Sequence, residues 1–456
     1  MIRAMNQRSQ GGFTLIETIL GLTVMVIMIT AISQLFVDNL RVLTLSKARN
    51  IAIALANEQI EYLRDLPYDN VKTQYGAIYP PGLIPDSQTV VRGGYTFTEV
   101  TEVSYVDDPY DGNAAGTIVG KPKDLNPGDY KKAQVSIYLK SSGQLVARLT
   151  SDVAAKAAET ASNTGVISVK VIDASGNPIP NANVHIYNPS PTPDVDIQTT
   201  TDNLGFVVIP NLPLDSTNNY QITVTLAGYS TDMTIADPPG TQTAVELNPN
   251  VLLQQVTSIT LTIDRTSTLN VHVVNTAGSV LASLPVTITG AKQIELNPTV
   301  YKYSATTTTD ASGNIALPGL ECDSYSYAVP SGYYLVSVQP YAPGTLSPNT
   351  SQTVNLVVST SSNYPAIATA SPTKASTGSN PTSIKLTGTN FNGSSTVVLK
   401  QTGQTDITAT SVVPSGSNTI LSFNVNLTGA ATGSWDIVVT TSSGTVTQTG
   451  GFSVTP

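Results

Sequence analysis

The sequence contains few of the residues that most enzymes use for chemistry. Its 456 residues include one cysteine, Cys322, and two histidines, His185 and His272, and only 12% of them are charged. A single cysteine excludes an intramolecular disulfide, and we expect Cys322 to be a small buried hydrophobe. The histidines fall at outward positions of separate predicted strands, so neither a shared zinc site nor a catalytic triad is indicated.

The charge balance and the missing motifs exclude further classes of protein. The net charge is -9, and no run of Lys or Arg follows the first dozen residues. Because nucleic-acid binding needs a basic patch, we expect no nucleic-acid partner for the body of the protein. No nucleophile elbow, phosphate-binding loop or paired-cysteine metal motif is present. We therefore expect a protein that is not an enzyme and has no cofactor.

The N-terminus combines a short basic leader with a long apolar segment. Residues 1–12 are polar and contain Arg3 and Arg8 but no acidic residue, and residues 13–37 are almost wholly apolar. As a helix, the apolar segment would be roughly 37 Å long, enough to span a bilayer. A secretory signal peptide is cut after its apolar region. Here the small-residue pair Gly11-Gly12 precedes that region, so a cut there would leave the apolar segment on the mature protein.

Glu17 is the only ionisable residue between Phe13 and Val37. A carboxylate at membrane depth costs several kcal/mol unless it is paired, and this cost indicates a functional residue. Cleavage after Gly12 would create a positive amine at Phe13, about one helical turn from the Glu17 side chain. The two charges would neutralise each other within one chain or between staggered neighbours in an apolar filament core.

Gly12, Phe13 and the following Thr-Leu-Ile-Glu17 resemble the signature of the type IV prepilin family. The resemblance implies cleavage between Gly12 and Phe13 by a prepilin peptidase, N-methylation of Phe13, and a role for Glu17 in subunit assembly. It implies two further partners, namely other pilin subunits, bound through the N-terminal helix, and an inner-membrane assembly platform. The chain would be a single-pass protein of the cytoplasmic membrane before assembly and part of an extracellular pilus afterwards. An ordinary membrane anchor is the alternative.

The helix is predicted to continue beyond the membrane, over residues 13–66. Residues 38–65 contain no Pro or Gly, and Leu66-Pro67 is a stop signal. A globular β domain is expected over residues 67–156, with a strand at 95–106 and a hairpin over 130–149. A long helix followed by a small antiparallel sheet is the pilin architecture.

An acidic run lies between these predicted strands. Asp107, Asp108 and Asp111 are weak candidates for a calcium site, and Asp124 and Asp129 follow further on. The run does not fit an EF-hand loop, and Asp, Asn, Gly and Pro are also ordinary turn residues. We expect a solvated turn without a metal, with calcium as the alternative.

Beyond a linker the chain carries an internal repeat. Residues 167–176 align with 269–278 at an offset of 102, and residues 201–206 align with 309–314 at an offset of 108. The second copy therefore carries about six extra residues in a loop. The pattern resembles the carboxypeptidase regulatory-like domain, an accessory β-sandwich without peptidase activity. We assign two such domains, to residues 165–265 and 266–358.

The last stretch, residues 362–456, does not continue the repeat. Its Gly388-Thr-Asn-Phe391 turn and its late Gly433-Ser-Trp435 strand resemble the immunoglobulin-like IPT/TIG domain. We expect Trp435 to lie in the core, because the lone Trp of a small sandwich usually does. The predicted fold is therefore an α+β pilin, a long N-terminal helix with a small antiparallel sheet, followed by three all-β immunoglobulin-like sandwich domains.

These features predict a structural subunit of a type IV pilus-like filament. A minor or tip pilin is favoured on steric grounds, because closely spaced subunits leave little room for everything that follows residue 164. The sandwich domains would then mediate adhesion to a surface, carbohydrate or protein ligand. The alternatives are a pseudopilin of a type II secretion or DNA-uptake system and a decorated major pilin.

Overall fold

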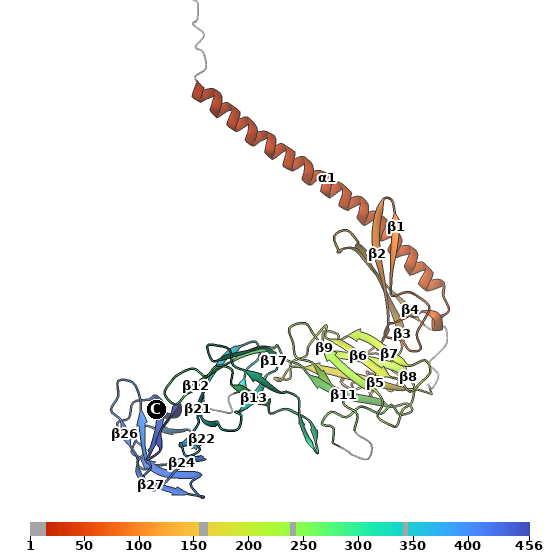
Figure 1. Cartoon of the computed structure of the whole chain (residues 1–456). Helices are drawn as coiled ribbons and strands as arrows, with labels where there is room; N and C mark the ends of the chain where they lie inside the picture. Colours follow the sequence, from red (N-terminus) through yellow and green to blue (C-terminus); the bar gives the residue numbers. More distant parts are fainter. Residues whose placement is uncertain (1–14, 155–162, 238–242, 341–344) are drawn as a thin grey trace, which may run out of the picture. The chain divides into compact units, whose positions relative to one another are not determined.

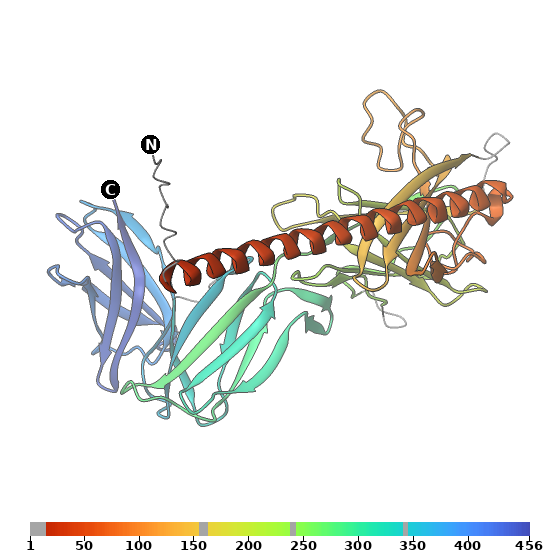
Figure 2. The same ribbon diagram turned by 90° about the horizontal axis from the view of Figure 1, so that it is seen from above.

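A single long helix opens the part of the chain that the structure describes. The computed structural model describes residues 15–154, 163–237, 243–340 and 345–456. Helix α1 (Leu15–Asp65) is continuous and is followed by the short 3-10 helix η1 (Tyr68–Asn70) (Figures 1 and 2). It ends before Pro67, whose ring disfavours a helical residue before it. The expected helix is therefore confirmed over residues 15–65.

The chain divides into two compact units, residues up to 163 with 209–212, and the remainder. In the first unit, one antiparallel sheet of order β1-β2-β3-β4 packs on the helix. Its strands are β1 (Ser87–Arg92), β2 (Tyr95–Val106), β3 (Tyr130–Leu139) and β4 (Gln144–Ala154). The predicted strand over 95–106 and the predicted hairpin are both confirmed.

The C-terminal half of α1 supplies one wall of this unit's core. A stripe of small and apolar residues at helical spacing is buried there, namely Ala48, Ala52, Leu55, Ala56, Ile60 and Leu63. It packs on inward-facing residues of the sheet, including Phe97, Val103, Val135 and Ile137. The alanines allow the helix backbone to lie close to the sheet, so the sheet is fixed on the last turns of the helix.

The second unit begins with a β-sandwich, which we call the first β-segment. One sheet has the order β10-β9-β6-β7 and the other β11-β5-β8, with β11 parallel to β5. The strands are β5 (Gly165–Ile172), β6 (Asn183–Asn188), β7 (Val195–Thr200), β8 (Phe206–Leu212), β9 (Gln221–Thr225), β10 (Asp232–Met233) and β11 (Val256–Thr262).

The second β-segment has two four-stranded sheets, β17-β12-β21-β19 and β16-β13-β18-β20, and a separate hairpin, β14-β15. The strands are β12 (Ser267–Asn275), β13 (Pro285–Gly290), β14 (Gln293–Leu296), β15 (Thr299–Tyr301), β16 (Ser304–Thr308), β17 (Asn314–Leu320), β18 (Asp323–Ala328), β19 (Tyr334–Gln339), β20 (Thr345–Leu346) and β21 (Ser351–Ser359).

The two copies of the sequence repeat make the same hydrogen bonds. The Val171 amide donates to Gly205 O, and the Val273 amide donates to Gly313 O, each at 2.8 Å. Both glycines have φ +76°, which disfavours any residue with a Cβ. A Cβ on Gly205 would also lie 2.5 Å from Val171 O. The repeat seen in the sequence is thus a repeat of structure.

The third β-segment has sheets of order β22-β24-β28-β27 and β23-β30-β29-β25-β26. Its strands are β22 (Ala366–Ser371), β23 (Lys374–Ser376), β24 (Thr382–Thr389), β25 (Thr396–Lys400), β26 (Ile407–Thr408), β27 (Thr410–Ser415), β28 (Ile420–Val425), β29 (Gly433–Thr441) and β30 (Gly444–Thr455). Trp435 is 1% exposed, which confirms the prediction that it lies in the core.

The second and third β-segments share contacts at their boundary. Val336 of β19 belongs to the core of the third segment, and Gln448 Nε2 donates to Val338 O at 2.9 Å. A long helix followed by sandwich sheets is the predicted order of elements. The division of residues 165–456 into three separate domains stays a prediction, because these segments do not have fully separate cores.

Candidate functional site

The N-terminal half of α1 presents an apolar surface that the sheet of its own unit does not cover. Its most apolar 18-residue window has a mean hydropathy of 2.3 and is entirely exposed, so the helix is long and apolar enough to cross a membrane. Leu15 is 81% exposed and Phe36 is 63% exposed. The large apolar side chains exposed on this half are Leu15, Ile16, Ile19, Leu20, Leu22, Val24, Met25, Val26, Ile27, Met28, Ile29, Ile32, Leu35, Phe36, Val37, Leu40, Val42, Leu43 and Leu45.

An apolar surface of this extent requires a partner. Burial of one large apolar side chain is worth about 1.5–3 kcal/mol, so covering this surface is worth on the order of tens of kcal/mol. Apolar residues surround the helix on all sides here, unlike the single stripe from Ala48 onward. A helix that is apolar all round is suited to lipid or to a bundle of similar helices, since both offer apolar contacts in every direction.

Glu17 lies in the first turn of α1, among these apolar residues. The positive end of the helix dipole favours a negative charge at this position. The predicted cleavage site and methylation site, Gly12 and Phe13, lie outside the described residues, as does the leader 1–12. The proposed pairing of the Phe13 amine with Glu17 therefore stays a prediction.

The acidic loop between β2 and β3 brings three carboxylates together. One oxygen each of Asp107, Asp124 and Asp129 lies within 4.8 Å of the others. The Ala114 amide donates to Asp107 Oδ2 at 2.8 Å, whereas Asp107 Oδ1 and Asp124 Oδ2 are buried without a hydrogen-bond partner. Carboxylate oxygens gathered in this way are the ligands that calcium prefers.

Burial, reinforced by the neighbouring negative charges, raises the pKa of two of these carboxyl groups. Burial, followed by the charges of Asp124, Asp129 and Asp111, raises the pKa of Asp107 to about 6, against the lowering effect of the Ala114 amide. Burial is also the main cause of the raised pKa of Asp124. Of the three weak candidates from the sequence, Asp107 belongs to the group, while Asp108 and Asp111 lie outside it.

Sequence reasoning did not place Asp124 and Asp129 beside Asp107. Asp124 and Asp129 lie well beyond Asp107 in the sequence. An isolated β-bridge between Asn113 and Lys123 folds the loop back so that they come close to Asp107. The Asp124 amide donates to Asn113 O at 3.0 Å. The only signal in the sequence was the high density of Asp between two predicted strands.

The histidines and the cysteine belong to the second compact unit, whereas this loop belongs to the first. His185 Nε2 contacts Asp196 Oδ1 across β6 and β7 at 2.8 Å, and His272 Nδ1 contacts Asn314 Oδ1 across β12 and β17 at 2.8 Å. The two histidines belong to different sheets, as expected.

Cys322 is only partly buried, because it lies in the short turn between β17 and β18. The expectation that it would be buried is therefore wrong. Burial and the nearby Asp264 raise the pKa of its thiol, which keeps it protonated.

Comparison with known proteins identifies one part of the chain. No curated protein matches the sequence. The similarity to solved structures is low. The Bacillus anthracis TIE protein is 13% identical over 79% of this chain and 70% of its own, with a TM-score of 0.19. A shaft pilin of Lactobacillus rhamnosus GG is 15% identical over 44% of this chain and 98% of its own, with a TM-score of 0.17. A streptococcal ancillary pilin is 12% identical over 64% of this chain and 98% of its own, with a TM-score of 0.16.

The family comparison agrees with the fold of the first β-segment. The model of the carboxypeptidase regulatory-like domain matches residues 166–274, which cover β5 to β11 and most of β12. Strand β5 is buried along most of its length and burial alternates along β6, so both strands supply inward apolar side chains to a sandwich core. Residues 166–274 of this chain therefore contain a carboxypeptidase regulatory-like β-sandwich domain.

Proposed function

We propose that this chain is a pilin-like subunit that is cut between Gly12 and Phe13 and assembled into a type IV pilus-like filament. The observation that carries the proposal is the exposed apolar surface of α1, whose part up to Val37 contains one carboxylate, Glu17, and lies just after the Gly12-Phe13 pair. Lipid would cover this surface in the cytoplasmic membrane, and neighbouring copies of α1 would cover it in the filament. Both surroundings are apolar, so one surface serves both states.

Glu17 would set the position of each incoming subunit. Cleavage creates an amine at Phe13, and the Glu17 carboxylate is the only acid of the apolar segment that can neutralise it. A carboxylate left unpaired in apolar surroundings costs several kcal/mol, so a subunit in the wrong axial position is disfavoured. The prepilin peptidase and an inner-membrane assembly platform would be the partners in this process.

The β-segments would act by display. We assign the chain to the minor or tip subunits, which present residues 165–456 for adhesion to a surface, a carbohydrate or a protein. The third segment would be an IPT/TIG-like sandwich. The subunit would have no catalytic activity of its own, and no nucleic acid would bind the β-segments, since the chain carries a net charge of -9.

The assembly role is tested by Glu17→Val, with Thr23→Val as the matched control. Thr23 lies on the same exposed half of α1, and its hydroxyl donates only to Ile19 O at 2.8 Å among the described contacts. We expect Glu17→Val to be inserted and cleaved but missing from sheared filaments, while Thr23→Val enters them normally. Equal incorporation of both variants would contradict the proposal.

Two related functions give other outcomes. A pseudopilin would make secretion or DNA uptake depend on Glu17 while adhesion stays intact. A decorated major pilin would place the β-segments at regular intervals along the whole shaft, which labelling of the C-terminal segment would reveal. Labelling confined to a tip or to rare positions supports the proposal.

A further inference from the structure

The second β-segment carries a hairpin that the first β-segment, the other copy of the repeat, lacks. The first copy connects β6 to β7 directly, whereas the second copy inserts β14 and β15 between β13 and β16. The six extra residues inferred from the change in offset belong to this connection. The hairpin is not part of either four-stranded sheet of its own segment.

Strand β14 binds the first β-segment instead. The Val245 amide donates to Ile294 O at 3.0 Å, and the Leu296 amide donates to Thr243 O at 2.8 Å, so Ala244 and Glu295 face each other as an antiparallel pair. The stretch that receives β14 is itself tied to the first segment, because the Ile235 amide donates to Glu246 O at 2.7 Å. The hairpin thus extends from one segment onto the other.

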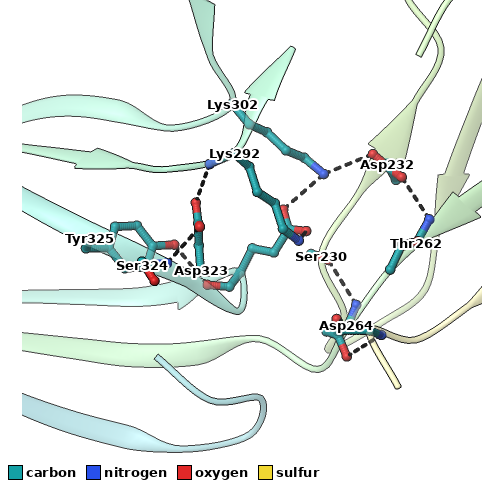
Figure 3. A network of polar contacts seen from close by, with 11 residues as sticks. Ser230, Asp232, Thr262, Asp264, Lys292, Lys302, Asp323, Ser324 and Tyr325 are labelled. Atoms are coloured by element: carbon teal, nitrogen blue, oxygen red, sulfur yellow. Dashed lines mark hydrogen bonds and ion pairs between the residues drawn. The ribbon is translucent and has the colours of Figure 1, made fainter. Parts of the chain in front are cut away.

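An ion-pair network holds the base of the hairpin (Figure 3). Lys302 Nζ lies 3.0 Å from Asp232 Oδ1 of the first segment and 3.0 Å from Glu321 Oε2 of the second. Lys292 pairs with the same Glu321. The Lys302, Asp232 and Glu321 side chains are 25%, 16% and 12% exposed, so water screens these pairs less than it screens ordinary surface pairs.

The network is also fixed in position by the backbone. The Thr262 amide donates to Asp232 Oδ2 at 2.8 Å, and the Lys292 amide donates to Asp323 Oδ2 at 2.9 Å. Asp232 is therefore attached to β11, and the start of the hairpin is attached to β18. Glu246 adds a further nearby carboxylate, so removing the Lys302 ammonium would leave acids of both segments facing one another.

We propose that the β14-β15 hairpin is a strap that docks on residues 243–246, and that Lys302 clasps it by bridging Asp232 and Glu321. The strap joins the first and second β-segments into one mechanical unit, so force applied to the second segment passes to the first through the strap and through the short connection at residues 263–266. This coupling does not depend on whether the chain enters a filament.

Engineered cysteine pairs in the full-length chain in detergent test the docking. In a Cys322→Ser background, Ala244→Cys with Glu295→Cys joins the two facing strands, whose spacing suits a disulfide. Gln293→Cys with Tyr301→Cys lies within the hairpin and is the matched control. We expect both pairs to form on mild oxidation. Formation of the control pair alone, or of neither pair, would overturn the strap.

The clasp is tested by adding Lys302→Met to the 244–295 pair. Loss of the mostly buried Lys302 ammonium should lower the rate of disulfide formation at the 244–295 pair about tenfold, the equivalent of about 1.4 kcal/mol. The circular dichroism spectrum and the rate of disulfide formation at the 293–301 pair should stay unchanged. Lys400→Met removes an exposed pair with Asp406 and should have no effect. Disulfide formation at the parent rate in Lys302→Met would overturn the clasp. So would an intact mass lower than the sequence mass by one water, which would indicate an amide in place of the ion pair.

Discussion

Replacing Lys131 with Met should remove a pH dependence of stability that a buried ammonium creates. Lys131 is 1% exposed on β3, and its Nζ donates to Tyr68 O at 2.8 Å. The ammonium also lies 4.4 Å from the Tyr68 ring centroid and 5.5 Å from that of Tyr105. A carbonyl and two aromatic faces replace the water that an exposed ammonium would have, and they do so incompletely.

The magnitude follows from the pKa. Burial, with a smaller contribution from Lys72, lowers the pKa of Lys131 from 10.5 to about 8, while Asp69 opposes the shift. Because the folded pKa is the lower one, the unfolded chain binds more protons between pH 8 and 10.5, and stability rises with pH across this window. At about 1.4 kcal/mol per pKa unit, the full rise is roughly 3 kcal/mol.

Calorimetry of the full chain in detergent at pH 7 to 10.5 measures this rise. Lys132→Met is the matched control, since Lys132 is the exposed neighbour of Lys131 on the same strand. We expect the transition of the N-terminal unit to rise by several degrees with pH in the parent and in Lys132→Met, and to stay level in Lys131→Met. The same pH dependence in all three proteins would refute the reasoning.

The acidic loop, the repeat and the apolar helix each give a further prediction. The pKa of Asp107 is raised to about 6, so its protonation stabilises the fold below pH 4, and this stabilisation is lost as the pH rises through 6. Asp107→Asn should remove this fall in stability with pH, as melting curves would show. At pH 7, a solvated turn predicts that millimolar calcium leaves the melting temperature of the parent unchanged, whereas a rise in the parent that is absent in Asp107→Asn would show the alternative, a calcium site. Gly205→Ala should cost about 1–3 kcal/mol more than Gly176→Ala by chemical denaturation, because both have positive φ but only Gly205 faces a backbone oxygen. Deleting residues 15–37 should release the protein from the membrane fraction, as fractionation would show.

Regular patterns made much of the fold predictable from the sequence. A long apolar run followed by a stripe of small and apolar residues predicted the helix over 15–65, and Pro67 predicted its end. Alternation gave the strands at 95–106 and 130–139, and the shared turn residues gave the repeat. Lys131 could also have been recognised, because it shares strand parity with Ala133, Val135 and Ile137, which face the core.

Contacts between distant residues could not be predicted in this way. The sequence showed that the second repeat has extra residues, but not that they reach back to residues 243–246. Asp232, Lys302 and Glu321 each look like ordinary surface residues, since no local pattern relates them. Asp124 and Asp129 join Asp107 only because an irregular loop folds back on itself, and irregular backbone has no periodicity to detect.

Cryo-electron microscopy of surface filaments from the native cell tests the central claim most directly. The account predicts density for this chain with residue 13 as its first residue, α1 packed among the helices of neighbouring subunits, and Glu17 beside a subunit N-terminus. Filaments that lack the chain, or a chain that keeps residues 1–12 and remains in the membrane, would contradict it.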